Sequence, residues 1–305
     1  SKISMMQPNN VLQLAKLAKK YNCTEALFVT GERPEEKYQL AREWLRKNNF
    51  KSTAEYLIHC SELVLNEGIF PHTNAGNLTK NEMQELKKTN VSMGLMLENI
   101  TNRLRGKGMP HEGAPSKEPK TRLEVLNNAG ILKIPMTTGI LVGIGETFEE
   151  IIDSIFSIKQ IHEKFGNIQE VILQNFHPKF DTKMKNHSTP SDLYFKMVVA
   201  LCRIIMPNSN IQIPPNLSPY SYQEFLSVGV NDWGGISPIT SDYVNPEFQW
   251  PKIKTVEKNC KKLGFEIKAR FPVYPEFLPL VNSDLKQRLS LIADENDYVK
   301  GDYWR

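Results

Sequence analysis

The chain has 305 residues, 40% of them hydrophobic, and a formal net charge of +4 from 38 basic and 34 acidic residues. This small positive excess is spread along the chain, which argues against a nucleic-acid-binding protein, where basic residues gather in one patch. No apolar run reaches the roughly 18 residues that a membrane span requires, and no signal-peptide pattern opens the chain, so we expect a cytoplasmic protein without a membrane or nucleic-acid partner.

The hydrophobic periodicity predicts helices that alternate with strands along most of the chain. T-x-x-E patterns at Thr79 and Thr147 are typical of capping boxes and mark where two of the helices begin. We expect helices over 8–20, 35–48, 53–66, 80–88, 119–129, 148–165, 190–205, 221–228 and 251–262. We expect strands over 26–30, 68–73, 91–97, 136–143, 168–176, 210–213 and 232–236.

Strand–helix alternation of this kind favours parallel strands connected by crossover helices. A closed, TIM-like (β/α) barrel normally has eight strands, whereas seven are predicted here and the chain starts with a helix. We therefore predict an α/β fold in which residues 1–270 form a (β/α) barrel core whose first strand lies upstream of Ser1. Residues 271–305 are expected to form an extension packed on the barrel. A doubly wound open sheet is the alternative, because it does not need the additional strand.

The four cysteines, Cys23, Cys60, Cys202 and Cys260, are far apart and form no CxxC or CxxxCxxC pattern. This sequence therefore carries no local motif for a metal ion or cluster. We expect the last three to be small buried hydrophobic residues, and the compartment to be reducing. Residues 106–119 are rich in glycine, proline and charge and predict a mobile lid loop.

The predicted strands end in polar residues. In a parallel barrel the active site lies at the carboxyl ends of the strands. Side chains of Asn, Gln, Glu and His at these ends favour a pocket that binds a small molecule through many hydrogen bonds. The ends are residues 30–33, 72–74, 98–99, 143–146, 174–177 and 214–216, and the seventh strand is framed by residues 231–233.

The stretch TTGILVGIGETFEE at residues 137–150 joins an apolar strand to an acidic helix start. It lacks the third glycine of the dinucleotide pattern G-x-G-x-x-G, and its three carboxylates already satisfy the field at the amino end of the helix. We therefore do not expect a phosphate-bearing dinucleotide here. A plain strand–helix joint is one alternative. A glycine in mid-strand, such as Gly139, marks the close approach of another group, which favours a cationic ligand or one with hydroxyls and an aromatic ring.

Residues Gly139, Leu141, Gly143 and Glu146 are spaced as in the GxIxGxxE motif of radical S-adenosylmethionine enzymes, which this segment resembles with Leu in place of Ile. In that superfamily the strand lies behind the adenine of S-adenosylmethionine. The resemblance therefore implies that Gly139, Gly143 and Ile144 line a cofactor site.

Three other segments extend this resemblance. Gly31-Glu32 is similar to the family's GGE-type motif, which holds the methionyl amino group, although Thr30 replaces the first glycine. Glu98 lies where relatives place a polar residue near the ribose. Arg122 matches the arginine that relatives direct at the methionyl carboxylate.

A closer resemblance covers residues from about 5 to 277. It is to the first subunit of the 7,8-didemethyl-8-hydroxy-5-deazariboflavin synthases, and chance similarity is excluded because nine segments match in order. They are CTEALFVTGERPEE (23–36), PHTNAG (71–76), SMGLMLEN (92–99), TTGILVGIGET (137–147), QEVILQNFHPK (169–179), PPNL (214–217), NDWGGISP (231–238), DYVNPE (242–247) and FPVYPEF (271–277).

This family holds a [4Fe–4S] cluster with a CxxxCxxC motif after the first barrel strand. No such motif is present here, so the resemblance implies that the cluster cysteines, like that strand, are expected upstream of Ser1, and no metal ligand is assigned in this chain. The implied reaction begins with reductive cleavage of S-adenosylmethionine to methionine and a 5′-deoxyadenosyl radical. The radical abstracts hydrogen from a tyrosine-derived hydroxybenzyl–ribitylaminouracil adduct made by a companion subunit. Ring closure with loss of ammonia, a lyase reaction, gives the deazaflavin.

The polar strand ends suit such a substrate, since a uracil ring and a ribityl chain need many donors and acceptors. Each candidate also has a structural alternative: the histidines as hydrogen-bonded supporting residues, Asp232 as a turn cap and Trp233 as a core residue. The candidates for proton transfer are His72, His177 and Asp232. The candidates for substrate binding are Asn74, Gln174, Asn175, Asn216, Asn231 and Trp233.

Two other functions remain open from the sequence. A radical S-adenosylmethionine enzyme of the biotin-synthase or menaquinone-pathway type would keep Glu32, Arg122 and the 137–150 motif but would lack the QNFHPK and NDWGG segments. A non-catalytic binding subunit would lack the cluster motif altogether.

Overall fold

The computed structural model describes residues 5–304. The chain divides into two compact units. The first unit consists of Ser1–Leu95, Asn127–Met136 and Lys268–Arg305. The second unit consists of Met96–Leu126 and Thr137–Ile267. The boundary predicted near residue 270 stays a prediction.

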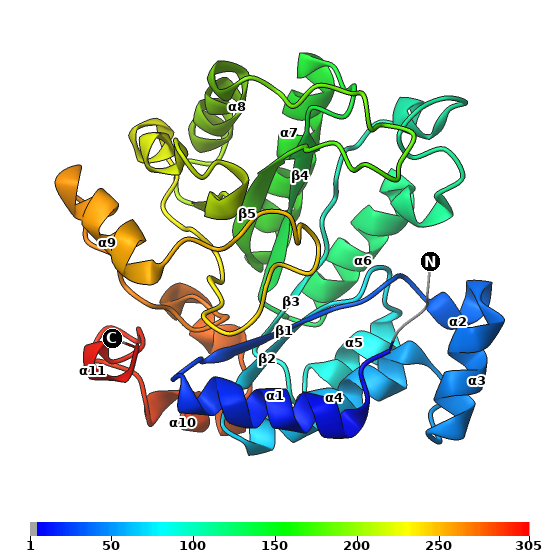
Figure 1. The fold of residues 1–305 in the computed structure, drawn as a ribbon, viewed down its shortest axis with the longest axis vertical. Coiled ribbons are helices and arrows are strands. Elements are labelled where there is room, and N and C mark those ends of the chain that lie inside the picture. Colours follow the sequence, from blue (N-terminus) through cyan, green and yellow to red (C-terminus); the bar gives the residue numbers. More distant parts are fainter. Residues whose placement is uncertain (1–4, 305) are drawn as a thin grey trace. The chain divides into compact units, whose positions relative to one another are not determined.

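The first unit contains three parallel strands and the helices that connect them. Its elements up to the third strand are α1 (Pro8–Lys20), β1 (Glu25–Val29), α2 (Pro34–Lys37), α3 (Gln39–Lys47), α4 (Thr53–Asn66), β2 (Phe70–Asn74), α5 (Lys80–Leu86) and β3 (Ser92–Gly94). Strand β2 lies between β1 and β3, and Val29 pairs with Asn74 while His72 pairs with Ser92. Figure 1 shows α1 alongside α4, which packs on β2. The predicted strands are confirmed, but β3 is shorter than the predicted 91–97.

Local sequence explains where the helices of this unit begin and end. Thr79 and Glu82 form the predicted capping box of α5, since each side chain accepts a hydrogen bond from the other residue's backbone N–H. The helix predicted over 35–48 is divided in two, because Tyr38 has extended backbone angles (φ −121°, ψ 125°). The sequence pattern missed this break because both halves keep helical periodicity.

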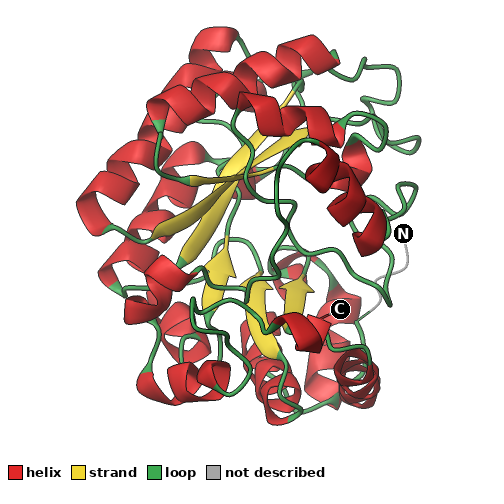
Figure 2. Ribbon diagram, turned by 90° about the vertical axis from the view of Figure 1, so that its left-hand side faces the viewer, coloured by secondary structure: helices red, strands yellow, loops and turns green. Residues whose placement is uncertain are grey.

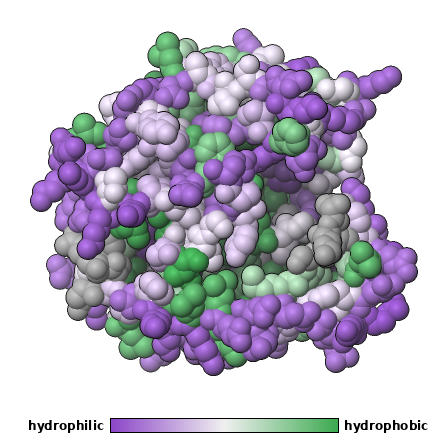
Figure 3. Space-filling model, viewed as in Figure 1, coloured by the Kyte–Doolittle hydropathy of each residue, from purple (hydrophilic) through white to green (hydrophobic). Residues whose placement is uncertain are grey.

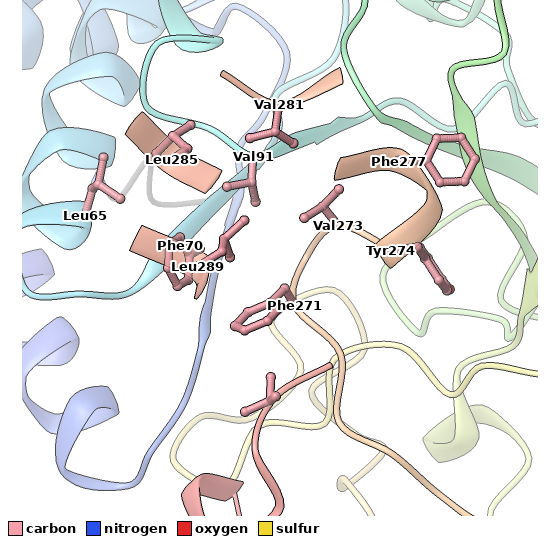
Figure 4. Packing of buried hydrophobic residues seen from close by; sticks show 11 residues of the cluster. Leu65, Phe70, Val91, Phe271, Val273, Tyr274, Phe277, Val281, Leu285 and Leu289 are labelled. Carbon is pink, nitrogen blue, oxygen red and sulfur yellow. The ribbon is translucent and has the colours of Figure 1, made fainter. Parts of the chain in front are cut away.

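The end of the chain adds a hydrophobic cluster to the first unit (Figure 4). This final part of the chain contains η5 (Pro275–Leu280), α10 (Ser283–Ser290) and α11 (Gly301–Trp304). Phe271 packs edge-on against Phe70 of β2, with ring centroids 5.7 Å apart. The buried residues of the cluster are Leu65, Phe70, Val91, Phe271, Val273, Tyr274, Phe277, Val281, Leu285, Leu289 and Val299.

The chain between β3 and this final segment continues the alternation of strands and helices. Its elements are η1 (Arg103–Arg105), η2 (Pro115–Lys117), α6 (Pro119–Ile131), β4 (Met136–Val142), α7 (Phe148–Phe165), β5 (Ile168–Asn175), α8 (Asp192–Ile205), β6 (Asn210–Gln212), η3 (Pro215–Leu217), η4 (Tyr222–Val228) and α9 (Ile253–Lys262). In the second unit β5 and β6 pair in parallel, with Glu170 opposite Asn210. Figure 2 shows the strands, in yellow, flanked by helices in red.

Two predicted elements of the second unit are wrong. The strand predicted over 232–236 is reduced, among the described residues, to one parallel bridge between Asp232 and Gln212, because the Gly234 turn (φ 69°) follows at once. The helix predicted over 221–228 is a 3₁₀ helix that ends at Gly229 in the left-handed region (φ 111°). Seven residues with a helical apolar pattern do not distinguish the two helix types.

The surface seen in Figure 3 is mostly hydrophilic, with scattered apolar side chains. Among residues 5–304, no helix combines the length and the apolar character that crossing a membrane requires.

Candidate functional site

The turn between β4 and α7 is stabilised by its own carboxylate. Gly143 and Gly145 both have positive φ (96° and 104°). The backbone N–H groups of Gly143 and Ile144 donate to the two oxygens of Glu146, at 2.6 and 2.8 Å. The side chain of the protein therefore occupies the position where a phosphate would bind to such a turn, which agrees with the exclusion of a dinucleotide.

The helix that follows begins with the predicted capping box of Thr147 and Glu150. Arg103 forms a two-pronged ion pair with Glu150, with N···O distances of 2.9 and 2.7 Å, and also donates to the carbonyl of Gly145 at 2.7 Å. Hydrogen bonding to Arg103 lowers the pKa of Glu150 from its ordinary value of 4.5 to about 2. Residues before and after β4 are thus tied to the same turn.

The mid-strand glycine of β4 accommodates a neighbouring strand. A Cβ atom on Gly139 would lie 1.9 Å from the carbonyl oxygen of Ile172 in β5. On Gly143 it would lie 2.7 Å from Cδ of Pro190. Both glycines therefore permit close approach, as their place in the sequence predicts, but the approaching groups in this structure belong to the protein.

Glu98 is held against β4 in a strained backbone conformation. It has φ 67°, unusual for a residue with a side chain. Its N–H donates to Gly139 at 3.0 Å, and its carbonyl accepts from Leu141 at 3.1 Å. Lys117 donates to Oε1 of Glu98, and Oε2 accepts no hydrogen bond from the described residues. The carboxylate is thus oriented, with one oxygen available to a ligand.

Arg122 lies near the start of α6, directly after the 106–119 loop. It is buried, and its guanidinium donates to the carbonyls of Ser116, at 2.9 Å, and Met96. Burial lowers the pKa of His111 in the same loop, with Glu98 acting in the opposite direction. The end of the predicted lid loop thus contacts both residues, because Lys117 binds Glu98 and the carbonyl of Ser116 accepts from Arg122.

In the first unit, the end of β1 presents Gly31 and Glu32. Gly31 is exposed, and a Cβ atom there would have no neighbour within 4 Å. The carboxylate of Glu32 accepts from the N–H of Asn77 at 3.2 Å. It also lies against Gly76 (φ 75°), where a Cβ atom would come within 2.9 Å of it. Gly76, the last residue of the PHTNAG segment, and Asn77 thus position the side chain of Glu32.

Arg33 is a supporting residue that the sequence analysis missed. Its guanidinium binds the Glu82 carboxylate at 2.5 and 3.2 Å and the Asn77 carbonyl at 3.1 Å. The capping box could have indicated this role, because it uses one oxygen of the Glu82 carboxylate and leaves the other able to accept from a cation such as Arg33.

His72 and Asn74 point to the same face of β2, because strand side chains alternate. The ring of His72 and the side chain of Asn74 both lie over Gly94 of β3. Ser92 Oγ donates its proton to the carbonyl of Pro272. The hydroxyl must therefore accept from Nδ1 of His72, 2.6 Å away, so Nδ1 carries the ring proton and Nε2 the lone pair. Burial, aided by the charge of Arg270, lowers the pKa of His72 to about 3. His72 is therefore a neutral hydrogen-bond acceptor near pH 7.

In the second unit, the end of β5 is tied to the turn after β6. Asn175 Nδ2 donates to the carbonyl of Leu217 at 3.1 Å. His177 Nε2 lies 2.9 Å from the same carbonyl, which can only accept, so Nε2 carries the proton and Nδ1 is the basic nitrogen. Burial lowers the pKa of His177, and its ring lies 4.5 Å from that of Phe248.

We call residues 242–248 the strap. Its Asp242 accepts from Nδ2 of Asn216 at 2.9 Å, and its Asn245 accepts from Lys179 at 2.9 Å. Lys179 also pairs with Glu247. The QNFHPK, PPNL and DYVNPE segments, distant in the sequence, are thus brought together by hydrogen bonds. The sequence analysis did not single out Asp242; its signal was membership of DYVNPE.

The remaining candidates are not brought into this group. Asn231 is exposed at the amino end of β6, where its amide accepts from Ile211 N–H at 2.8 Å. Asp232 caps the turn by accepting from Gly234 N–H at 2.6 Å. Trp233 is buried in the core, where its Nε1 donates a hydrogen bond to Sγ of Cys260. Gln174 of β5 is half-buried.

The positions of these residues favour the structural alternatives. Asn231 and Asp232 stabilise β6 and the turn beside it, and Trp233 packs edge-on against Tyr222 at 5.2 Å. All three were predicted as site residues because they frame a strand, predicted over 232–236, that is absent from the described structure.

No group of three or more His, Cys, Asp or Glu side chains among the described residues is arranged to hold a metal ion. The four cysteines are free thiols. Burial raises the pKa of Cys60 to about 11 and that of Cys202 to about 12, so neither provides a thiolate readily.

Comparison with known proteins places this geometry in context. The model of the radical SAM superfamily matches residues 1–158. A 7,8-didemethyl-8-hydroxy-5-deazariboflavin synthase of Methanopyrus kandleri is 44% identical, covering 97% of this chain and 89% of its own. The enzyme of the same name from Methanocaldococcus jannaschii is 47% identical, covering 91% and 77%. FO synthase of Streptomyces coelicolor is 39% identical over 98% of this chain, which spans 36% of that longer protein.

Two solved structures share the fold at low sequence identity. Methylornithine synthase has a TM-score of 0.65 and 16% identity, covering 87% of this chain and 75% of its own. The FeFe-hydrogenase maturase HydG from Carboxydothermus hydrogenoformans has a TM-score of 0.66 and 20% identity, covering 95% and 71%.

Proposed function

The chain belongs to the radical S-adenosylmethionine superfamily and, within it, to the 7,8-didemethyl-8-hydroxy-5-deazariboflavin synthases, and from this membership we propose its substrate, its reaction class and the residues that act. Its fold is the TIM-like (β/α) barrel type of these enzymes. The proposed substrate is a hydroxybenzyl–ribitylaminouracil adduct. The proposed reaction is a lyase step that closes the deazaflavin ring and releases ammonia.

The residues fit S-adenosylmethionine, the cofactor of the family. When bound, this cofactor supplies the radical that abstracts hydrogen from the substrate. In the second unit, Oε2 of Glu98 is an acceptor suited to a ribose hydroxyl, while Lys117 holds Oε1. Arg122 is the proposed partner of the methionyl carboxylate. In the first unit, Glu32 is the proposed partner of the methionyl amino group, and the open space around Gly31 leaves room for it.

The [4Fe–4S] cluster of the family requires a set of cysteine thiolates. The described residues do not fit it, because their cysteines lie apart and the thiols of Cys60 and Cys202 are buried with raised pKa values. No step of the mechanism proposed for these residues therefore passes through the cluster.

The observation that carries the substrate proposal is the convergence of Asn175, His177 and Asn216 beneath the strap in the second unit. These side chains offer amide and imidazole groups of the kind that a uracil ring binds. His177 is the better candidate for proton transfer, since its Nδ1 is basic and Nε2 is anchored. His72 is proposed to orient the substrate as an acceptor, because its lowered pKa makes it a weak base.

A companion subunit or region is the proposed source of the adduct. The longer Streptomyces coelicolor FO synthase supports this, since the match covers only 36% of its length. A reducing cytoplasm is the proposed compartment, and the four free cysteines favour it.

The test is anaerobic turnover by the whole gene product reconstituted with iron and sulfide. Incubated with reductant, S-adenosylmethionine and the adduct, the enzyme is expected to yield deazaflavin, detected by fluorescence and mass, with ammonia and 5′-deoxyadenosine. Deoxyadenosine without deazaflavin would indicate a different substrate.

A matched pair of variants tests the residue roles. His177→Gln is expected to lower the rate of deazaflavin formation by roughly 10²–10⁴-fold while the binding of S-adenosylhomocysteine is unchanged. Asn231→Ala, at the amino end of β6, is the control and should keep the native rate per folded molecule. Equal losses in the two variants would contradict the role of His177.

A further inference from the structure

Asn216 is a buried amide with one unsatisfied atom. It lies in the short 3₁₀ turn after β6 and is 1% exposed. Its Nδ2 donates to Oδ2 of Asp242, at 2.9 Å, and to the carbonyl of Phe248, at 3.4 Å. Its Oδ1 is buried and has no hydrogen-bond partner among the described residues. A buried carbonyl oxygen left unpaired is destabilising, so this atom favours a ligand that donates a hydrogen bond to it.

The strap fixes the orientation of this amide. Both groups that face Nδ2 are acceptors, so a rotated amide would place Oδ1 against two oxygens. Asp242 is itself held in place, because Oδ1 accepts from the N–H groups of Val244 and Asn245 at 2.8 and 3.0 Å. These bonds hold the carboxylate toward Asn216, so Oδ1 of Asn216 points away from Asp242 and Phe248 in this structure.

We propose that Oδ1 of Asn216 accepts a hydrogen bond from the substrate. Asp242 is the positioning residue, because it binds Nδ2 and so leaves Oδ1 to face the substrate. The inference rests on the proposed function and deepens it. The tip of the strap is exposed (Tyr243 72%, Val244 53%), whereas Asp242, Asn245 and Phe248 contact the rest of the second unit.

The proposed substrate carries several donors: the ring N–H between the two carbonyls of the uracil, the amino and ribitylamino N–H groups, the phenol O–H and the ribityl hydroxyls. We assign the ring N–H to Asn216, because it is a donor in a rigid ring and cannot accept, whereas a hydroxyl also accepts and is satisfied by many groups. A site that offers one fixed acceptor selects most strongly against a ligand in which the donor is replaced by a methyl group, because that ligand leaves the oxygen unpaired.

The experiment is calorimetric binding to the native, folded chain. The probes are 5-amino-6-ribitylaminouracil, its N3-methyl derivative, and 5,6-diaminouracil, which lacks the ribityl chain. Native protein is expected to bind the parent compound roughly tenfold or more tightly than the N3-methyl derivative. In Asn216→Ala this ratio should fall to near one. If the native protein instead binds the parent compound and its N3-methyl derivative equally, but binds 5,6-diaminouracil more weakly and loses that difference in Asn216→Ala, the donor is a ribityl hydroxyl and the assignment of the ring N–H is overturned.

Asp242→Asn tests the positioning role. Its new Nδ2 would face Asn216 and turn that amide around, so that a donor points at the ligand. The preference for the parent compound over the N3-methyl derivative should then vanish or reverse. Tyr243→Ala, at the exposed tip, is the control and should keep the native ratio.

The outcomes separate the two proposals. Binding of the parent compound with the same ratio in the native chain and in Asn216→Ala would overturn the reading by Asn216. An unchanged ratio in Asp242→Asn would overturn the positioning role. Absence of any binding by the native chain would count against the proposed substrate, and the inference would fall with it. Circular dichroism of each variant establishes that it is folded.

Discussion

Two parts of the second unit carry motif residues of the family, and they use their polar groups differently. In the turn after β4, Glu146 accepts from the backbone of Gly143 and Ile144, so donors and acceptors are satisfied internally. Beneath the strap, Asn216 keeps a buried oxygen that has no hydrogen-bond partner within residues 5–304. The first arrangement stabilises a fold, whereas the second has unused capacity for a ligand.

We infer from this difference that a residue within a family motif can serve the fold rather than the ligand. The turn residues are proposed to shape the wall of the cofactor site, so changes there should reduce stability more than binding. Changes beneath the strap should reduce binding more than stability. Three substitutions around β4 test the first half of this contrast.

The largest effect is expected for Gly139→Ala. The added Cβ would lie 1.9 Å from the Ile172 carbonyl, so β4 and β5 must separate. We expect a loss of about 3 kcal/mol or more in the free energy of unfolding, at the upper end for overpacking, measured by urea denaturation. Gly301→Ala is the control, because its Cβ would meet nothing within 4 Å. A stable Gly139→Ala protein that fails to bind S-adenosylhomocysteine would show instead that a ligand fills this space.

The sequence was sufficient for features that depend on neighbouring residues. Periodicity identified the strands from β1 to β6, and the capping boxes at Thr79 and Thr147 lie where predicted. These signals are local, since hydrophobic spacing and backbone capping act within a few residues.

The sequence was insufficient where contacts join distant segments. The pairing of Asn216 with Asp242 spans 26 residues, and no local pattern announces it. Trp233 shows the same limit, because an aromatic residue beside glycines suits a binding pocket and a core equally, and only its contacts with Tyr222 and Cys260 decide. Gly139 correctly predicted that another group lies close to β4, but the sequence did not indicate that this group is the carbonyl of Ile172.

A smaller effect is expected for Glu146→Gln. The substitution keeps one acceptor oxygen but places an NH₂ group against a backbone donor, which should cost about 1–3 kcal/mol of stability. The affinity for S-adenosylhomocysteine should change less than tenfold, since the carboxylate serves the turn. Glu149→Gln, on the exposed first turn of α7, is the matched control. A large loss of affinity with native stability would show that Glu146 touches the ligand.

The smallest effect concerns the pH dependence of the Arg103–Glu150 pair. Its folded-state pKa of about 2 is below the ordinary value of 4.5, so the pair contributes fully above pH 4.5 and loses its contribution as the pH falls toward 2. The stability difference between the native chain and Glu150→Gln should therefore shrink across this range, as measured by urea denaturation at successive pH values. Because Arg103 is partly exposed, 1 M salt should also reduce the difference at pH 7. A difference that is independent of pH and salt would mean that Glu150 acts only through its capping hydrogen bonds, and that the turn is held without Arg103.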